Sequence, residues 1–201
     1  MVRTAVLVSG GGTNLQAIID AKAAGRLPHA ELALVAASRA DAFALTRAER
    51  AGIPTAVVRK AKDEAASDYG ERLLFLLREH QIGLVVLAGF LTILPENVVR
   101  AYDHRILNIH PSLIPSFCGA GFYGLRVHEA ALRRGVKLTG ATVHYVNEIP
   151  DGGEIIAQKA VAVEAGDTPE TLQRRVMEQA EWLLLPQALE TVAARLDTEE
   201  P

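Results

Sequence analysis

Hydrophobic residues in the first half of the chain gather in short runs, and segments of helix length separate one run from the next. Strands of a parallel sheet are buried on both faces, so they carry nearly continuous hydrophobic residues instead of alternating ones. The pattern therefore predicts buried parallel strands joined by crossover helices. The predicted strands are TAVLVS (4–9), ELALVAAS (31–38), PTAVVR (54–59), LVVLAGF (84–90) and RILNIH (105–110).

Polar residues and glycines between these runs predict the ends of the helices. A Ser, Thr, Asp or Asn side chain can cap the first helical turn, whereas glycine and proline end a helix. The predicted bounds are Thr13 or Asn14 to Gly25 for the first helix, Asp41 to Gly52 and Pro54 for the second, and about Asp63 to His80 for the third.

The second half of the chain has a different pattern. Two longer strands, VKLTGATVHYVNEI (136–149) and GEIIAQKAVAV (153–163), meet at the turn signal PDGG (150–153), which predicts an antiparallel hairpin. A long closing helix follows, with Thr168 as its cap and Pro169 at its first position.

Apolar residues at helical spacing predict the buried face of the closing helix. Pro186 is expected to kink this helix, because proline lacks the N–H that the helix needs. The acidic end DTEEP (197–201) is expected to fray. The predicted buried stripe is Leu172, Val176, Leu183 and Val192.

Together these elements predict an α/β fold. We expect an open, mostly parallel, doubly wound (Rossmann-like) sheet with a C-terminal antiparallel hairpin and a long closing helix. The sequence shows no repeat, low-complexity segment or linker, and 201 residues suit one domain with a substantial core. A single domain over residues 1–201 follows.

Composition and charge narrow the class of protein. A net charge of −3 disfavours nucleic acid as a partner, because proteins that bind phosphate backbones are usually basic. No apolar run reaches the length of a membrane span, and glycines interrupt the N-terminus too early for a signal peptide. The single cysteine, Cys118, cannot form an internal disulfide, so a cytoplasmic location is expected.

The loop SGGGTN, Ser9 to Asn14, lies between the first predicted strand and the first predicted helix. Phosphate groups bind at this place in α/β proteins, because free backbone N–H groups and the positive end of the helix dipole meet there. Leu15 stands where a dinucleotide fingerprint needs its third glycine, and the loop lacks a P-loop lysine. The loop therefore favours a phosphomonoester, while a tight turn at positive φ would use the same glycines.

Polar side chains also end the last predicted parallel strand, in NIHPSLIP (108–115). Asn108 and His110 share one face of that strand, and Pro111 stops it. Strand capping and catalysis explain these two residues equally well on their own.

Residues of the hairpin favour catalysis. Thr142 and His144 share one strand face, and Asp151 lies in the hairpin turn. With Asn108 and His110 they could form an acyl-transfer site, in which the amide and a protonated imidazole stabilise an oxyanion and the carboxylate orients the imidazole. A metal site is disfavoured, because the two histidines lack metal-ligand spacing and cysteine ligands are absent.

Six segments spread over nearly the whole chain match the pattern of a known family: VLVSGGGTNLQAIID, ASRADAFALTRAERAGIP, VVLAGFLTILP, ILNIHPSLIP, GATVHYVNEIPDGG and AGDTPETL. NIHPSLIP followed at this distance by DGG is a highly specific pair. By these segments the chain resembles the phosphoribosylglycinamide formyltransferases of purine synthesis.

The resemblance implies a role for individual residues. The catalytic trio is implied to be Asn108, His110 and Asp151, supported by Thr142 and His144. The residues implied to hold the substrate phosphate and ribose are Gly11, Gly12, Thr13, Asn14 and Glu181. The residues implied to line the folate pocket are Leu91, Thr92, Ile93, Leu94, Asn108, Asn147, Glu148, Ile149, Pro150 and Asp151.

The resemblance also implies the reaction. The formyl group of 10-formyltetrahydrofolate, a co-substrate, passes to the amine of glycinamide ribonucleotide, without a metal and without nucleic-acid or membrane partners. Residues 1–110 would bind the ribonucleotide phosphate, and residues 111–201 would bind folate and carry catalysis. The chain would act as a monomer or a homodimer.

Several positions depart from the family pattern, and one peptide bond gives a structural check of the resemblance. Thr92 stands where many relatives carry arginine, and Trp182 stands where histidine is expected. The segment SFCGAGFYGLRVHEAAL (116–132) is longer than in some relatives and is interpreted as a surface-loop variant. The resemblance further implies a cis peptide bond between Ile114 and Pro115.

Two rivals share the formyl chemistry. A formyltetrahydrofolate hydrolase should carry an additional regulatory domain, and a formyltransferase for initiator tRNA should carry an additional C-terminal domain and more positive charge. From another class, a phosphate-binding protein without catalysis would keep SGGGTN but would not need Asn108, His110 and Asp151 together.

Overall fold

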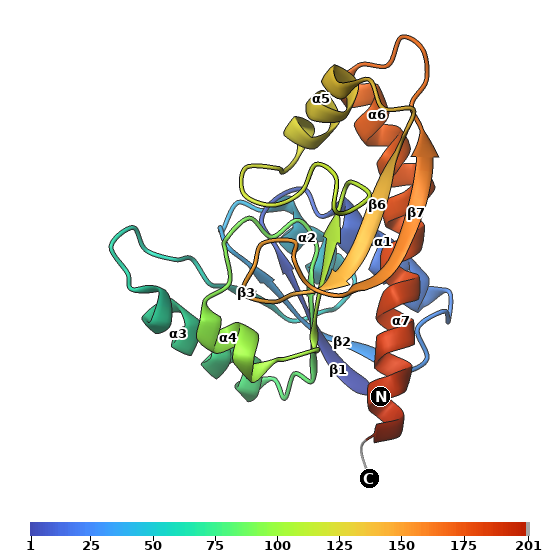
Figure 1. Cartoon of the computed structure of the whole chain (residues 1–201). Coiled ribbons are helices and arrows are strands. Elements are labelled where there is room, and N and C mark those ends of the chain that lie inside the picture. Colours follow the sequence, from blue (N-terminus) through green and yellow to red (C-terminus); the bar gives the residue numbers. More distant parts are fainter. Residues whose placement is uncertain (200–201) are drawn as a thin grey trace.

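The computed structural model describes residues 1–199 and contains one seven-stranded sheet in the order β3-β2-β1-β4-β5-β6-β7 (Figure 1). Strands β1 to β5 pair in parallel, whereas β5–β6 and β6–β7 pair antiparallel. The predicted doubly wound sheet and hairpin are therefore confirmed. The strands are β1 (Val2–Val8), β2 (Ala30–Ala37), β3 (Thr55–Val57), β4 (Leu84–Leu87), β5 (Ile106–His110), β6 (Leu138–Tyr145) and β7 (Ile155–Ala162).

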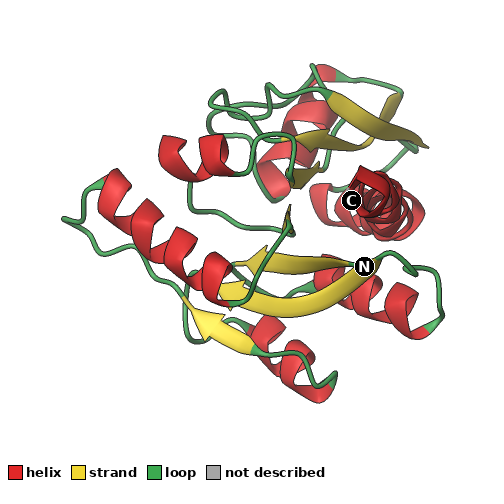
Figure 2. Ribbon diagram, turned by 90° about the horizontal axis from the view of Figure 1, so that it is seen from below, coloured by secondary structure: helices red, strands yellow, loops and turns green. Residues whose placement is uncertain are grey.

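Helices cover both faces of the sheet (Figure 2), because alternate residues of each central strand point to opposite faces. On one face Val6 and Val8 of β1 pack with α1, α2 and α7, and on the other Ala5 and Leu7 pack with α3 and α4. The helices are α1 (Thr13–Ala23), α2 (Phe43–Arg50), α3 (Ala66–Glu79), α4 (Glu96–Ala101), α5 (Leu125–Arg134), α6 (Pro169–Val176) and α7 (Trp182–Glu199).

The strand order reverses between β1 and β4, which lie side by side although three crossover connections separate them in the sequence. In open α/β sheets this switch point opens a crevice at the carboxyl ends of the strands, where ligands bind. The glycine loop follows β1, and the segment around Leu91 follows β4. Both segments therefore flank the crevice.

Two predicted N-caps are wrong. Helix α1 follows Gly12, which adopts a left-handed conformation at φ 72°, and no side chain of residues 1–199 caps it. Helix α2 follows Ala42, while the Asp41 carboxylate accepts a hydrogen bond from Arg39 Nε at 2.5 Å. The arginine outcompetes the backbone for this carboxylate. The third predicted helix begins at Ala66, three residues later than expected.

The segment 116–132 is only partly a surface loop, which corrects that interpretation. Its second part forms α5, where Val127, Ala130 and Ala131 are buried. The preceding glycines concealed the helix, and its apolar face became evident only through packing, because α5 lies against α6.

The closing helix is interrupted rather than simply kinked. A π-helical turn, η1 (Met177–Glu181), joins α6 to α7, which contains Pro186. Thr168 caps α6 as predicted, with a capping box formed by Thr171. The predicted stripe is correct for Leu172, Val176 and Val192 but wrong for Leu183, which is 43% exposed. The π turn rotates the following helix, so Leu184 and Leu185 are buried instead.

The predicted frayed tail is helical as far as Glu199, and the remainder lies outside the described residues. The N-terminal ammonium donates to the Asp197 carboxylate at 2.5 Å, so β1 and α7 meet at their ends. Among helices of the described part, none is long and apolar enough to cross a membrane.

Candidate active site

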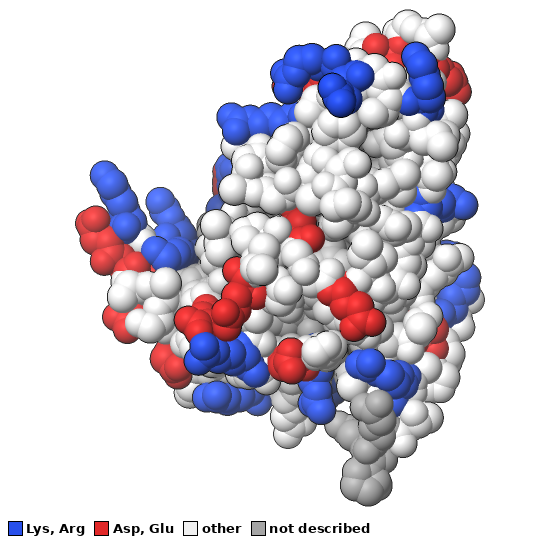
Figure 3. All heavy atoms as spheres, viewed as in Figure 1, with Lys and Arg blue, Asp and Glu red and all other residues white. Residues whose placement is uncertain are grey.

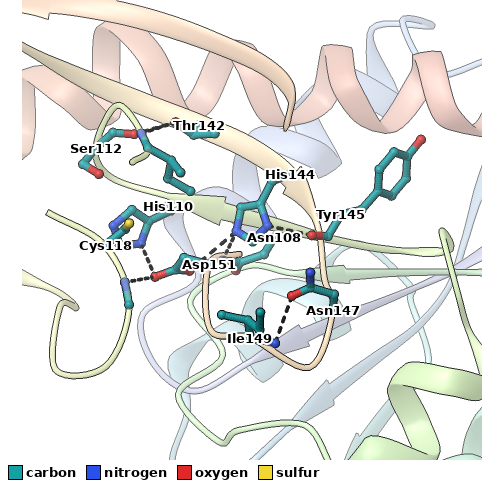
Figure 4. Close-up of polar contacts among 12 residues, drawn as sticks. Asn108, His110, Ser112, Cys118, Thr142, His144, Tyr145, Asn147, Ile149 and Asp151 are labelled. Atoms are coloured by element: carbon teal, nitrogen blue, oxygen red, sulfur yellow. Dashed lines mark hydrogen bonds and ion pairs between the residues drawn. The ribbon is translucent and has the colours of Figure 1, made fainter. Parts of the chain in front are cut away.

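The pairing of β5 with β6 brings the predicted polar residues together. Asn108 lies opposite His144, and His110 lies opposite Thr142. Residues opposite each other on an antiparallel pair point to the same face. The sheet register thus places all four side chains at the carboxyl end of β5, beside the β6–β7 loop that carries Asp151 (Figure 4).

Asp151 lies at the centre of these contacts. Its Oδ1 accepts a hydrogen bond from Asn108 Nδ2 at 3.3 Å, and its Oδ2 lies 3.4 Å from His110 Nδ1 (Figure 4). The backbone N–H of Gly119 donates to Oδ2 at 2.8 Å. The predicted convergence of the trio is therefore observed, and its catalytic roles stay predictions.

His144 orients Asn108. Its Nδ1–H donates to the Tyr145 carbonyl at 2.7 Å, and its Nε2 lies 3.1 Å from Asn108 Nδ2 and 3.5 Å from Asp151 Oδ1. In the same way His110 Nε2–H donates to the Phe117 carbonyl at 2.9 Å. The nitrogen of His110 that gains and loses a proton is therefore Nδ1, which faces Asp151.

Burial sets the charge of the trio. Burial lowers the pKa of His110 below its usual value, and the nearby Asp151 carboxylate only partly offsets this effect. Burial raises the pKa of Asp151, but the contacts with His144, His110 and the Gly119 N–H outweigh burial, so the net pKa lies below its usual range. In the free protein the Asp151 carboxylate therefore faces an imidazole whose neutral form is favoured by burial.

Thr142 holds the turn beside the trio. Its hydroxyl donates to the Ser112 carbonyl at 2.7 Å and accepts from the Ile114 N–H at 3.1 Å. The Ile114–Pro115 peptide bond is cis, as expected. Thr142 thus supports the chain around His110 without facing the cleft.

Two pockets meet at the trio. The first is lined by every residue that the sequence implied for folate, and its floor is apolar. Leu91, Ile93 and Ile149 are 65%, 81% and 66% exposed around it, so a large flat ligand could cover them. Residues of this pocket that sequence reasoning missed are Leu87, Phe90, Val99 and Val146, which looked like ordinary core positions.

The second pocket lies on the other side of the trio and reaches Asn14 and Glu181. Asn14 Nδ2 donates to Glu181 Oε2 at 2.7 Å, while Asn14 Oδ1 is buried without a partner among the described residues. Burial raises the pKa of Glu181. This amide–carboxylate pair could bind the hydroxyls of a sugar. Lining residues that sequence reasoning missed are Phe122, Tyr123, Gly124, Gln173 and Met177.

The glycine loop is built for close packing as well as for a ligand. A Cβ on Gly12 would lie 2.6 Å from the Ala44 Cβ, whereas Gly11 has open space around it. Gly11 O accepts from Arg47 Nε at 2.8 Å, which holds the loop against α2. Thr13 and Asn14 begin α1, so free N–H groups point out of the loop.

Charged side chains are unevenly distributed over the surface. On the face in Figure 3, acidic side chains gather near the centre and most basic ones lie toward the edge. No group of three or more His, Cys, Asp or Glu side chains within residues 1–199 is arranged to hold a metal ion.

Comparison with known proteins gives the family. The formyl transferase family model matches residues 2–189. The chain is 40% identical over 186 residues to a phosphoribosylglycinamide formyltransferase of Haemophilus influenzae, covering 89% of this chain and 82% of that protein. It is also 44% identical over 195 residues to the chicken trifunctional purine biosynthetic protein adenosine-3, covering 96% of this chain but only 18% of that protein.

Solved structures agree with this assignment. Glycinamide ribonucleotide transformylase 1 from Symbiobacterium toebii superposes with a TM-score of 0.90 at 41% identity, covering 97% of this chain and 89% of that one. The chain belongs to the formyl transferase family.

Proposed function

We propose that this protein transfers the formyl group of 10-formyltetrahydrofolate to the amine of glycinamide ribonucleotide. The observation that carries the proposal is the junction of the two pockets, since Asn108 and Asp151 line both of them. A donor in one pocket and an acceptor in the other would meet at these residues. Both pockets draw on residues 1–110 and on residues 111–201.

The acceptor would occupy the second pocket. Its phosphate dianion would accept hydrogen bonds from the free N–H groups at Gly12 to Asn14 and lie at the positive end of the α1 dipole. Its ribose hydroxyls would reach Asn14 Oδ1 and Glu181. Its amine would then lie beside the trio.

The donor would occupy the first pocket, with its pteridine ring against the apolar floor and its formyl group at Asn108. The exposed side chains of Leu91, Ile93 and Ile149 would lose contact with water on binding. Thr92 is uncharged, whereas many relatives carry arginine at this position. The donor would therefore be held mainly by burial and backbone contacts.

The contacts of the trio support the following route of transfer. The neutral amine attacks the formyl carbon, and a C–N bond forms as the carbonyl oxygen becomes an oxyanion. Asn108 Nδ2 donates to this oxygen, and His110, once protonated at Nδ1, stabilises its charge. Asp151 accepts a proton from the attacking nitrogen and passes it to N10, directly or through water, as the bond from carbon to N10 breaks. The products are formylglycinamide ribonucleotide and tetrahydrofolate.

Occupied pockets are needed to favour His110 protonation. Asp151 is ionised at neutral pH because its pKa is low, so a negative charge already faces Nδ1. Charge developing on the formyl oxygen would add a second negative charge and raise the pKa of His110 during the reaction.

Turnover with both substrates tests the proposal. The absorbance change on release of the deformylated folate should depend on glycinamide ribonucleotide, with one formylglycinamide ribonucleotide formed per folate released. Folate release at the same rate without the ribonucleotide would instead identify a hydrolase. If no deformylated folate is released with or without the ribonucleotide, both the transferase and the hydrolase activities are refuted.

A further inference from the structure

Ser9 bridges the switch point of the sheet. It is the first residue of the glycine loop, it is 5% exposed, and its Oγ accepts a hydrogen bond from the backbone N–H of Leu91 at 2.9 Å. Leu91 lies beyond the end of β4, the neighbour of β1. A single side chain therefore connects the loops that follow the two strands at which the order reverses.

Leu91 belongs to the wall between the pockets, because it lines both of them. Its side chain is largely exposed, so few protein contacts hold this residue apart from its backbone. Ala88 N–H still donates to the Leu7 carbonyl at 2.9 Å and continues the β1–β4 pairing. The hydrogen bond to Ser9 then fixes the wall three residues further along.

The other side of the glycine loop is held independently. Gly10 O accepts from the Ala44 N–H at 3.1 Å, and Gly11 O accepts from Arg47 Nε at 2.8 Å. Ser9 Oγ also pairs with Ser38 Oγ at 2.7 Å, which fixes the orientation of the hydroxyl. Loss of the Ser9 hydroxyl would therefore release Leu91 while α2 still holds the loop.

We propose that Ser9 is a positioning residue for the donor, which keeps the Leu91 wall of the folate pocket in place. This rests on the proposed function, because the donor pocket is assigned there. Without the hydroxyl the partly buried Leu91 N–H loses its acceptor, and the wall can move away from the donor. Leu91 also lines the second pocket, but acceptor binding depends mainly on the N–H groups at Gly12 to Asn14, which keep their geometry.

Steady-state kinetics of Ser9→Ala and Ser38→Ala test this role. Ser9→Ala should raise the KM of the folate donor by about 5- to 30-fold, the effect of losing one hydrogen bond to a buried group, and leave the KM of the ribonucleotide within about twofold. Ser38→Ala is the matched control. It removes the other hydroxyl of the pair but keeps the bond to Leu91, so the donor KM should stay within about twofold.

Two further measurements do not depend on turnover. Calorimetric titration with tetrahydrofolate should show the same weakening for Ser9→Ala and none for Ser38→Ala. In the unsubstituted protein the Leu91 amide should exchange with solvent more slowly than an unprotected amide, which is informative even if Ser9→Ala fails to fold.

The outcomes separate this inference from the proposed function. If the unsubstituted protein binds no tetrahydrofolate, the proposed function fails. If it binds, the positioning role is overturned when Ser9→Ala binds the donor as tightly as the unsubstituted protein, or when it loses affinity for both substrates equally. The role is also overturned when Ser38→Ala weakens donor binding as much as Ser9→Ala does, or when the Leu91 amide is unprotected.

Discussion

The Asp151 carboxylate is held from several directions, and each contact comes from a different part of the chain. Asn108 lies on β5, Gly119 in the following loop, and His144 on β6. This convergence keeps the carboxylate ionised although its side chain is only 13% exposed. A fixed charge in a site shielded from water acts strongly on neighbouring groups.

Substitution of the trio should damage turnover more than binding. Asn108→Ala and His110→Ala should each lower kcat by about 10²- to 10³-fold, because each removes a group that stabilises the oxyanion. Asp151→Asn should also lower kcat, since the amide cannot accept the proton from the amine. Steady-state kinetics measure these effects, with His80→Ala as a control outside both pockets. Near-normal kcat in all three variants would place the reaction elsewhere.

The buried His128 is expected to lower the free energy of unfolding at acidic pH. It is fully buried on α5, both ring nitrogens lack partners among the described residues, and burial, with a smaller effect of His110, lowers its pKa to about 4. Its folded pKa lies below the unfolded value near 6.5, so the stability it contributes is fully present above about pH 6.5 and is lost as the pH falls toward 4.

Chemical denaturation at several pH values checks this prediction. Replacing His128 with Phe should reduce the decrease in unfolding free energy between pH 7 and pH 4 by up to about 3 kcal/mol, which corresponds to the depressed pKa. Parallel pH profiles for both proteins would contradict it, and His104→Phe is an exposed control.

At the scale of single elements, the glycine loop must both pack against α2 and leave room for a ligand, and two adjacent glycines meet these two requirements. Gly12 has a left-handed backbone and no room for a side chain against α2, whereas Gly11 faces open space. Gly12 is needed for packing, and Gly11 leaves room for a ligand.

Substitutions at these two glycines should therefore differ. Gly11→Val should raise the KM of the ribonucleotide at least about tenfold and leave the melting temperature nearly unchanged, because its side chain would enter the phosphate site. Gly12→Val should instead lower stability by about 1–3 kcal/mol through overpacking and strain. Kinetics and thermal unfolding of both variants measure this. Equal melting temperatures for the two would contradict the packing role of Gly12.

The start of α6 gives a second prediction for an element. Thr168 Oγ1 accepts from the Thr171 N–H, and Thr171 Oγ1 accepts from the Thr168 N–H. Thr168→Ala should cost about 1 kcal/mol of unfolding free energy and leave kcat unchanged, because this cap lies away from both pockets. Urea denaturation is the measurement, and unchanged stability would show that the cap contributes nothing.

At the scale of the whole molecule, the site exists because segments distant in the sequence meet at one edge of the sheet. Asn14 and Glu181 are 167 residues apart and hydrogen bonded. The two pockets share Phe90, Leu91, Asn108 and Asp151, and their other lining residues differ.

Ligand binding should therefore stabilise the fold from each pocket separately. Tetrahydrofolate or glycinamide ribonucleotide at about 100 times its Kd should each add about 2.7 kcal/mol to the unfolding free energy. The two ligands together should add both amounts, because they occupy different pockets. Thermal unfolding with each ligand and with both checks this, and a joint effect no larger than one alone would indicate a single shared site.

The sequence by itself determined the sheet and the hairpin, and it predicted the residues of the candidate site. Continuous apolar runs specify buried strands, and Asn108, His110 and Asp151 stand in motifs whose positions at strand ends can be inferred locally. Only the tertiary structure decided the caps of α1 and α2, the helix α5 and the reversal of Leu183. It also decided that the pKa of His110 is lowered, because burial there outweighs the opposing effect of a carboxylate 41 residues away. These features depend on which surfaces meet, and local patterns do not contain that information.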